Sequence, residues 1–171
     1  MAEEPLIVTA RLDEVASDWF EDLRRAHYPP ERNRVPAHLT LFHALPGREE
    51  TAIARALEAA CRSAAPMAVE VRGPWSLGRG VAYRMRSAEL EALRAGLAEA
   101  FAPWLTAQDR ATFRPHVTVQ NKADPEDAKR LLERLQLEFE PFQVWAEGLH
   151  VWRYLGGPWT PTARLDFSRD S

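Results

Sequence analysis

The hydrophobic positions of this chain change their spacing several times, from every second residue to every third or fourth. Short apolar runs rich in β-branched and aromatic residues are typical of strands, whereas spacings of three and four are typical of amphipathic helices. The runs predict strands at residues 6–11, 38–42, 67–71, 81–85, 116–120, 139–146, 149–154 and 163–167. The helical spacing predicts buried stripes formed by Val15, Trp19, Phe20 and Leu23, by Ile53, Leu57, Ala60 and Cys61, by Leu90, Leu93, Leu97 and Phe101, and by Ala128, Leu131, Leu132 and Leu135.

The order of these elements occurs twice. Each half runs through a helix, a loop with arginine and proline, a short strand that begins His-x-Thr, a second helix and two further strands. The side chains outside the motifs are not repeated, so the repeat is one of order. Strands and helices mixed at this spacing predict one α+β domain over residues 1–171. We expect a bilobal, pseudo-twofold duplicated fold, with antiparallel sheets lining a central cleft and helices outside.

The two motifs are His38-Leu39-Thr40 and His116-Val117-Thr118. Alternate side chains of a strand point to the same face. Each histidine is therefore expected to share a face with its threonine, while Leu39 and Val117 point to the core. The same alternation predicts Phe42 on the face of the first pair and Gln120 on that of the second.

Two facing His-Thr pairs suit an in-line attack on phosphorus. One imidazole takes a proton from the attacking hydroxyl or water and the other donates one to the leaving oxygen, since the unperturbed pKa of histidine lies near neutrality. The threonine hydroxyls can hydrogen-bond the non-bridging oxygens. The scheme requires neither a metal nor another cofactor, and none is expected.

A single His-x-Thr is weak evidence, because an isolated histidine in an apolar strand is usually a packing residue. The equivalent places of the two motifs in the repeated order argue against coincidence. The other histidines, His27, His43 and His150, are interpreted as structural or solvated, and Cys61 as a core residue rather than a nucleophile.

Candidate substrate contacts lie in the loops before the motifs and near the end of the chain. An arginine side chain can bind phosphate through two N–H donors at once. Arg114, two residues before His116, is the best candidate, and Arg34 and Arg153 are weaker ones. Arg32 and Arg110 also precede the motifs, but most arginines in loops are simply solvated. Tyr154 is a further candidate, although aromatic residues such as Trp152, Tyr154 and Trp159 more often serve packing.

The composition restricts the partners. The chain is 46% hydrophobic and 27% charged, its net charge is −3, and it has one cysteine. The net negative charge argues against a protein that binds along a long nucleic acid, because such binding needs many contacts between cationic side chains and phosphates. No apolar run is long enough for a membrane span, and the acidic start, residues 1–5, has no hydrophobic signal core. We therefore expect a cytoplasmic monomer that does not engage membranes.

At Val-Pro-Ala-His-Leu-Thr-Leu-Phe (35–42) and Phe-Arg-Pro-His-Val-Thr-Val (113–119) the chain resembles the two-histidine (2H) phosphoesterase superfamily, particularly 2′-5′ RNA ligase-like proteins and RNA cyclic phosphodiesterases. Residues 156–159, Gly-Gly-Pro-Trp, look similar too. The resemblance implies a hydrolase that opens 2′,3′-cyclic phosphates or acts on 2′-5′ linkages without a metal. It implies that His38 and His116 are the acid/base pair, that Thr40 and Thr118 bind phosphate, and that Phe42 contacts the substrate.

Many relatives carry an arginine shortly after the second motif, where this chain has Gln120, Asn121 and Lys122. Large structured RNA is therefore a less favoured substrate than a nucleotide or a short RNA with a cyclic or 2′-5′ phosphodiester. Two alternatives stay open: a nucleotide- or RNA-end-binding module with little activity, and an RNA 2′-5′ ligase. The motifs do not decide which histidine is the acid.

Overall fold

The computed structural model describes residues 4–169, and every strand pairing within them is antiparallel. The strands are β1 (Leu6–Leu12), β2 (Leu39–Leu45), β3 (Met67–Ser76), β4 (Val81–Arg86), β5 (His116–Gln120), β6 (Phe142–Arg153) and β7 (Thr160–Asp166). The α-helices are α1 (Glu14–His27), α2 (Glu50–Arg62), α3 (Ala88–Ala100), α4 (Ala107–Arg110) and α5 (Pro125–Glu138). Residues 1–3 of the acidic start lie outside the described residues.

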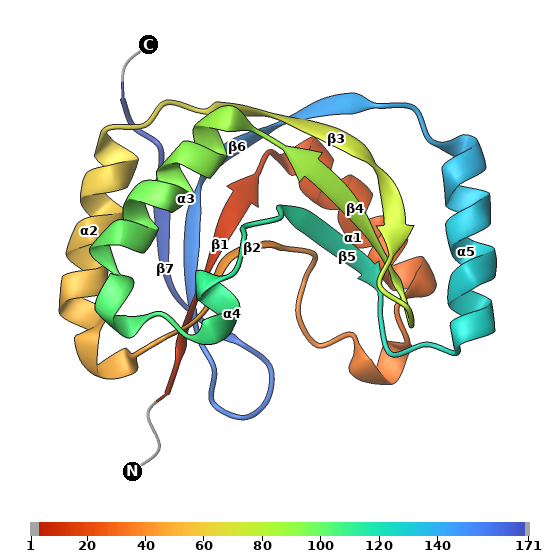
Figure 1. Cartoon of the computed structure of the whole chain (residues 1–171), viewed down its shortest axis with the longest axis horizontal. Helices are drawn as coiled ribbons and strands as arrows, with labels where there is room; N and C mark the ends of the chain where they lie inside the picture. Colours follow the sequence, from red (N-terminus) through yellow and green to blue (C-terminus); the bar gives the residue numbers. More distant parts are fainter. Residues whose placement is uncertain (1–3, 170–171) are drawn as a thin grey trace.

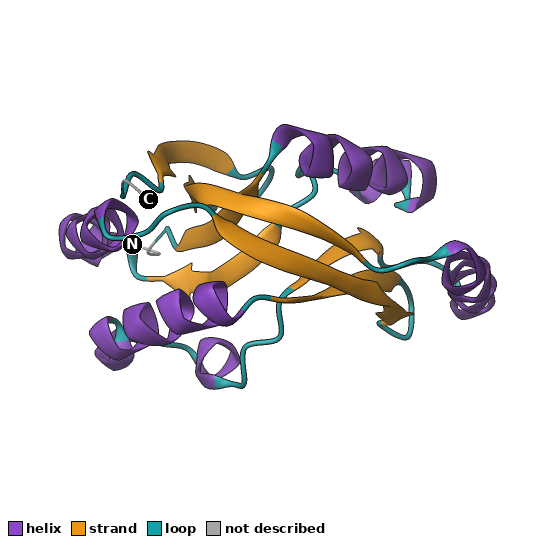
Figure 2. Cartoon of the chain, turned by 90° about the horizontal axis from the view of Figure 1, so that it is seen from above, coloured by secondary structure: helices purple, strands orange, loops and turns teal. Residues whose placement is uncertain are grey.

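The strands form one sheet that closes on itself. Their order is β1-β2-β5-β4-β3-β6-β7, and β1 also pairs with β6, so that six strands make a closed, barrel-like ring with β7 added at β6. Helices α2 and α3 lie at one end of the sheet and α1 and α5 at the other (Figures 1 and 2). The α+β, bilobal, pseudo-twofold fold predicted from the sequence is therefore confirmed.

One hydrophobic core joins the sheet to α1, α2, α3 and α5. On β1 the core side chains are Leu6, Val8, Ala10 and Leu12, and the residues between them point to the opposite face. That opposite face is called the open face below. On it lie Thr9 and Arg11 of β1, as the two-residue period requires. Cys61 is buried, as expected, and burial raises the pKa of its thiol to about 11.

The two strands predicted at 139–146 and 149–154 are a single strand, β6. Glycine is common in turns, but the backbone of Gly148 continues the ladder to β1 and β7. A Cβ at Gly148 would lie 2.0 Å from the carbonyl oxygen of Leu165. The glycine is needed for the close approach of β7, not for a turn.

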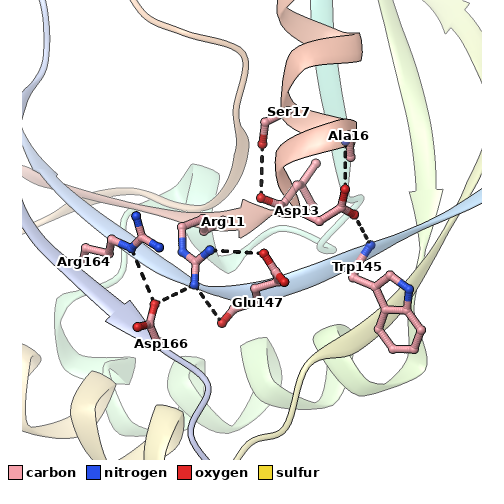
Figure 3. A network of polar contacts seen from close by, with 9 residues as sticks. Arg11, Asp13, Ala16, Ser17, Trp145, Glu147, Arg164 and Asp166 are labelled. Atoms are coloured by element: carbon pink, nitrogen blue, oxygen red, sulfur yellow. Dashed lines mark hydrogen bonds and ion pairs between the residues drawn. The ribbon is translucent and has the colours of Figure 1, made fainter.

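The helix stripe predicted for α1 is partly wrong. Ala16, Phe20 and Arg24 are the buried residues of α1, whereas Val15 is 81% and Trp19 38% exposed. Asp13 fixes this rotation, because its carboxylate caps the helix at the Ala16 amide (2.9 Å) and also accepts from the Trp145 amide of β6 (2.8 Å) (Figure 3). Trp19 still packs edge-on against Phe20 and Phe142.

Ion pairs connect three strands beside this junction (Figure 3). The Arg11 guanidinium of β1 lies 3.3 Å from the Glu147 carboxylate of β6 and 2.6 Å from that of Asp166 on β7. No helix within residues 4–169 has the length and apolar character needed to cross a membrane.

Candidate active site

The two motif strands meet at the centre of the molecule. Leu39 of β2 pairs with Val117 of β5, and both residues belong to the core. Continuing this antiparallel register by one residue each way places His38 opposite Thr118 and Thr40 opposite His116. Directly opposite residues on one face lie about 5 Å apart at their Cβ atoms, and diagonal ones somewhat further. All four side chains are partly exposed on the open face.

Both histidine rings are held in the same way. His38 Nδ1 lies 2.8 Å from the carbonyl oxygen of Pro36, and His116 Nδ1 lies 2.7 Å from that of Arg114. A carbonyl oxygen only accepts, so Nδ1 must carry the proton in each ring. Nε2 is then the nitrogen left to take up or release a proton. The repeated geometry equips each histidine for acid/base work in the same way.

Each motif strand bulges immediately after its threonine. On β2, Thr40 pairs with Thr9 but Phe42 pairs with the very next residue along β1, Val8. On β5, Thr118 pairs with Ala82 but Gln120 pairs with Val81. An extra residue in a strand reverses the alternation of side chains beyond it. The predictions that Phe42 and Gln120 lie on the site face fail for this reason.

Phe42 is therefore not a substrate-contacting residue. It is 0% exposed and packs edge-on against Phe101 of α3. The Arg94 guanidinium lies 4.4 Å from the centre of its ring. Gln120 is buried as well. The bulge turns both residues inward, so the open face ends at the threonines.

Two buried arginines that the sequence analysis missed support the motif strands from behind. Arg24 of α1 donates to the carbonyl oxygen of Thr118 on β5 (3.2 Å), and Arg94 of α3 donates to that of Leu41 on β2 (3.1 Å). Each therefore binds the motif strand of the other half of the sequence. The signal in the sequence was an arginine on an otherwise apolar helical stripe. Arg24 follows Phe20 by four residues in α1, and Arg94 follows Leu90 by four residues in α3.

The surroundings of His38 disfavour its charged form. Burial lowers the pKa of His38 to about 4, and the nearby positive charges of Arg24, His116 and His43 act in the same direction. The hydrogen bond to Pro36 opposes this effect. His38 is therefore neutral at neutral pH in the unliganded protein.

Aromatic residues wall the site beside the first motif. The Trp159 ring lies 4.7 Å from the His38 ring and 6.1 Å from the Trp152 ring, between centroids. Trp152 is held by a 2.9 Å hydrogen bond from Nε1 to the Thr9 hydroxyl. His38, Trp152 and His150 border a pocket of about 430 Å³ that continues along α1. The two tryptophans pack against each other, as expected, but Trp159 also packs against the motif residue His38.

The other predicted contacts lie around the site or elsewhere. Arg34, Arg114 and Tyr154 are exposed, and the role predicted for them stays a prediction. Arg153 is engaged with the carboxylates of Glu4 and Glu50, which removes it as a free cation. His43 is a structural residue, as expected, because its ring and amide both bind the buried carboxylate of Asp109. Across residues 4–169, no three His, Cys, Asp or Glu side chains form a group that could hold a metal ion.

Together, the closed duplicated sheet and the paired His-Thr quartet at its centre define a two-histidine phosphoesterase-type protein. A family model for the 2′-5′ RNA ligase superfamily matches residues 12–158, and the chain belongs to this superfamily. Its role is accordingly that of a phosphoesterase or a ligase-like enzyme. No curated protein matches the chain significantly by sequence.

Solved structures with the same fold cover almost the whole chain. TT0787 of Thermus thermophilus has a TM-score of 0.70 at 17% identity, covering 98% of this chain and 100% of its own. Escherichia coli LigT complexed with 3′-AMP has a TM-score of 0.63 at 18% identity, covering 98% and 99%. LigT complexed with NADP⁺ has a TM-score of 0.62 at 20% identity, with the same coverage. At these identities the likeness establishes the fold.

Proposed function

We propose that the protein hydrolyses 2′,3′-cyclic phosphates or 2′-5′ phosphodiesters of nucleotides or short RNA ends. The observation that carries this proposal is the quartet of His38, Thr40, His116 and Thr118 on one face, with both imidazoles anchored through Nδ1. Structural likeness to a protein solved with 3′-AMP supports a nucleotide ligand. Because one chain supplies both motifs, we take the monomer as the active unit.

The two histidines divide the proton transfers. His38, neutral at neutral pH, accepts a proton at Nε2 from the attacking water. His116, protonated, donates from Nε2 to the leaving ribose oxygen, which breaks its bond to phosphorus as the new P–O bond forms. The hydroxyls of Thr40 and Thr118 donate hydrogen bonds to the non-bridging oxygens, where charge accumulates in the transition state.

A screen of defined substrates tests the proposal. The purified chain would be incubated with the four 2′,3′-cyclic nucleotides and with 2′-5′- and 3′-5′-linked dinucleotides, and the products separated by chromatography. We expect turnover of cyclic or 2′-5′ substrates, with 3′-5′ dinucleotides left intact. The hydroxyl that keeps the phosphate identifies the leaving oxygen. Binding of mononucleotides without turnover of any substrate would instead favour a binding module, and joining of RNA ends a ligase.

The assignment of His38 as the base predicts the pH dependence of kcat/KM. A base must be unprotonated, so activity is lost as the pH falls through the pKa of His38, near pH 4. We expect kcat/KM to stay high at pH 5, where an ordinary histidine is mostly protonated. Circular dichroism at each pH would confirm that the protein is folded. An acid limb centred near pH 6.5, or activity confined to pH values below 4, would refute this assignment.

A further inference from the structure

Arg84 of β4 lies directly beside the second motif. In the ladder between β4 and β5, Arg84 pairs with His116 and Ala82 pairs with Thr118. Tyr83, between them, is a core residue, so Ala82 and Arg84 point to the open face together with the histidine and the threonine. The Arg84 side chain is exposed. A cation therefore stands next to the proposed acid on the neighbouring strand.

Trp75 of β3 determines where the Arg84 guanidinium lies. Trp75 pairs with Ala82, and the guanidinium carbon of Arg84 is 4.2 Å from the centre of the Trp75 ring. Trp75, Ala82 and Thr118 thus form one cross-strand row. By stacking on Trp75, the arginine leans along β4 toward the row that contains Thr118. The small side chain of Ala82 leaves space for it there.

The stacked guanidinium is free to bind an anion. Within the part of the chain that the structure describes, no carboxylate lies within ion-pair distance of Arg84, whereas Arg11, Arg72 and Arg153 are each paired. Stacking uses the face of the guanidinium and leaves the N–H groups at its edge available. These groups match two oxygens of a phosphate. The positive charge also complements the negative charge that phosphate brings to the two histidines.

We propose that Arg84 binds the non-bridging oxygens of the substrate phosphate and that Trp75 is its positioning residue. This inference rests on the proposed function, since it concerns the same site. Gln120, at the end of β5, carries no positive charge; in this proposal the charge comes from Arg84 on the adjacent strand β4. Arg84 differs in this from Arg114 and Arg34, which lie in loops and whose guanidinium groups contact no fixing partner among residues 4–169.

Calorimetric titration with adenosine 3′-monophosphate tests the role of Arg84 without turnover. We expect Arg84→Ala to raise Kd by about tenfold to a hundredfold, as for loss of a charge-assisted bidentate contact. Arg84→Lys keeps the positive charge but lacks the two parallel N–H donors of the guanidinium, so it should recover only part of the affinity. Arg86→Ala is the matched control, because Arg86 lies on the same face of β4 but faces Glu70 instead of β5. Its Kd should change by less than about twofold.

Trp75→Leu tests the positioning role. We expect a Kd between those of the wild type and Arg84→Ala, and no further loss when Trp75→Leu is added to Arg84→Ala, because the ring acts through the arginine. Unchanged affinity in Arg84→Ala, equal losses in Arg84→Ala and Arg86→Ala, or no binding by the wild type would each overturn the inference. Arg84-dependent binding without hydrolysis of any substrate would contradict only the proposed reaction. Hydrolysis with a Kd that is independent of Arg84 would contradict only the inference.

Discussion

Replacing either His38 or His116 with alanine is expected to lower kcat for the best cyclic or 2′-5′ substrate by about 10³-fold. Each imidazole handles one of the two proton transfers, and neither threonine nor arginine nearby can exchange a proton at neutral pH. The double variant should be hardly slower than either single one, because the two residues act in one concerted step. Single-turnover assays with excess enzyme would measure these rates.

The controls separate lost chemistry from lost structure. His27→Gln changes a histidine at the end of α1, outside the motifs, and should keep kcat within about twofold of the wild type. The motif variants should retain the far-UV spectrum and cooperative unfolding, since both rings are partly exposed. EDTA should not reduce turnover. A His38→Ala protein that works at the wild-type rate would disprove the two-histidine mechanism.

Each half of the candidate site was predictable because its histidine and threonine are only two residues apart in the sequence. Within His-x-Thr, alternation along a strand is enough to put both polar side chains on one face, and the structure has them there. The prediction failed for Phe42, which lies two residues beyond Thr40. A bulge leaves no reliable mark on local hydrophobic spacing, because it depends on which residues of the neighbouring strand find partners.

Pairing between distant strands was likewise outside the reach of the sequence. The repeated order of elements predicted two lobes, but not that Leu39 meets Val117 or that the helix of each half supports the strand of the other. Arg24 and Arg94 were overlooked because arginine is most often solvated. Their places on otherwise buried helical stripes were visible in the sequence, but the carbonyl groups of Thr118 and Leu41 that they bind were not.

Asp109 is expected to be the carboxylate whose loss most destabilises the fold. Its side chain is fully enclosed and accepts from the His43 amide at 2.9 and 3.0 Å, from the Ala44 amide at 3.1 Å and from His43 Nδ1 at 2.9 Å. These amides belong to β2 just beyond the bulge that follows Thr40. Burial alone would raise the pKa of Asp109, but the hydrogen bonds from His43 and Ala44 outweigh it and hold the pKa below 3.8.

We expect Asp109→Ala to reduce the free energy of unfolding by about 3 kcal/mol, since the amides of His43 and Ala44 lose a buried acceptor. Asp109→Asn should cost nearly as much, because its NH₂ group would face donors. Urea unfolding should show a midpoint lowered by about 1–2 M at an unchanged m-value. Asp22→Asn, which alters an exposed carboxylate paired with Arg25, is the control and should change stability by less than about 0.5 kcal/mol.

The same contacts give the Asp109 prediction a pH signature. A carboxylate whose pKa is lowered on folding stabilises the protein fully above its unfolded pKa, and this contribution disappears as the pH falls through the folded value. The stability difference between wild type and Asp109→Asn should therefore be constant at neutral pH and shrink only below about pH 3.8. A difference that is small at pH 7 would mean that β2 holds its bulge without Asp109. The placement of His38 and Thr40 would then depend on Arg94 and the core alone.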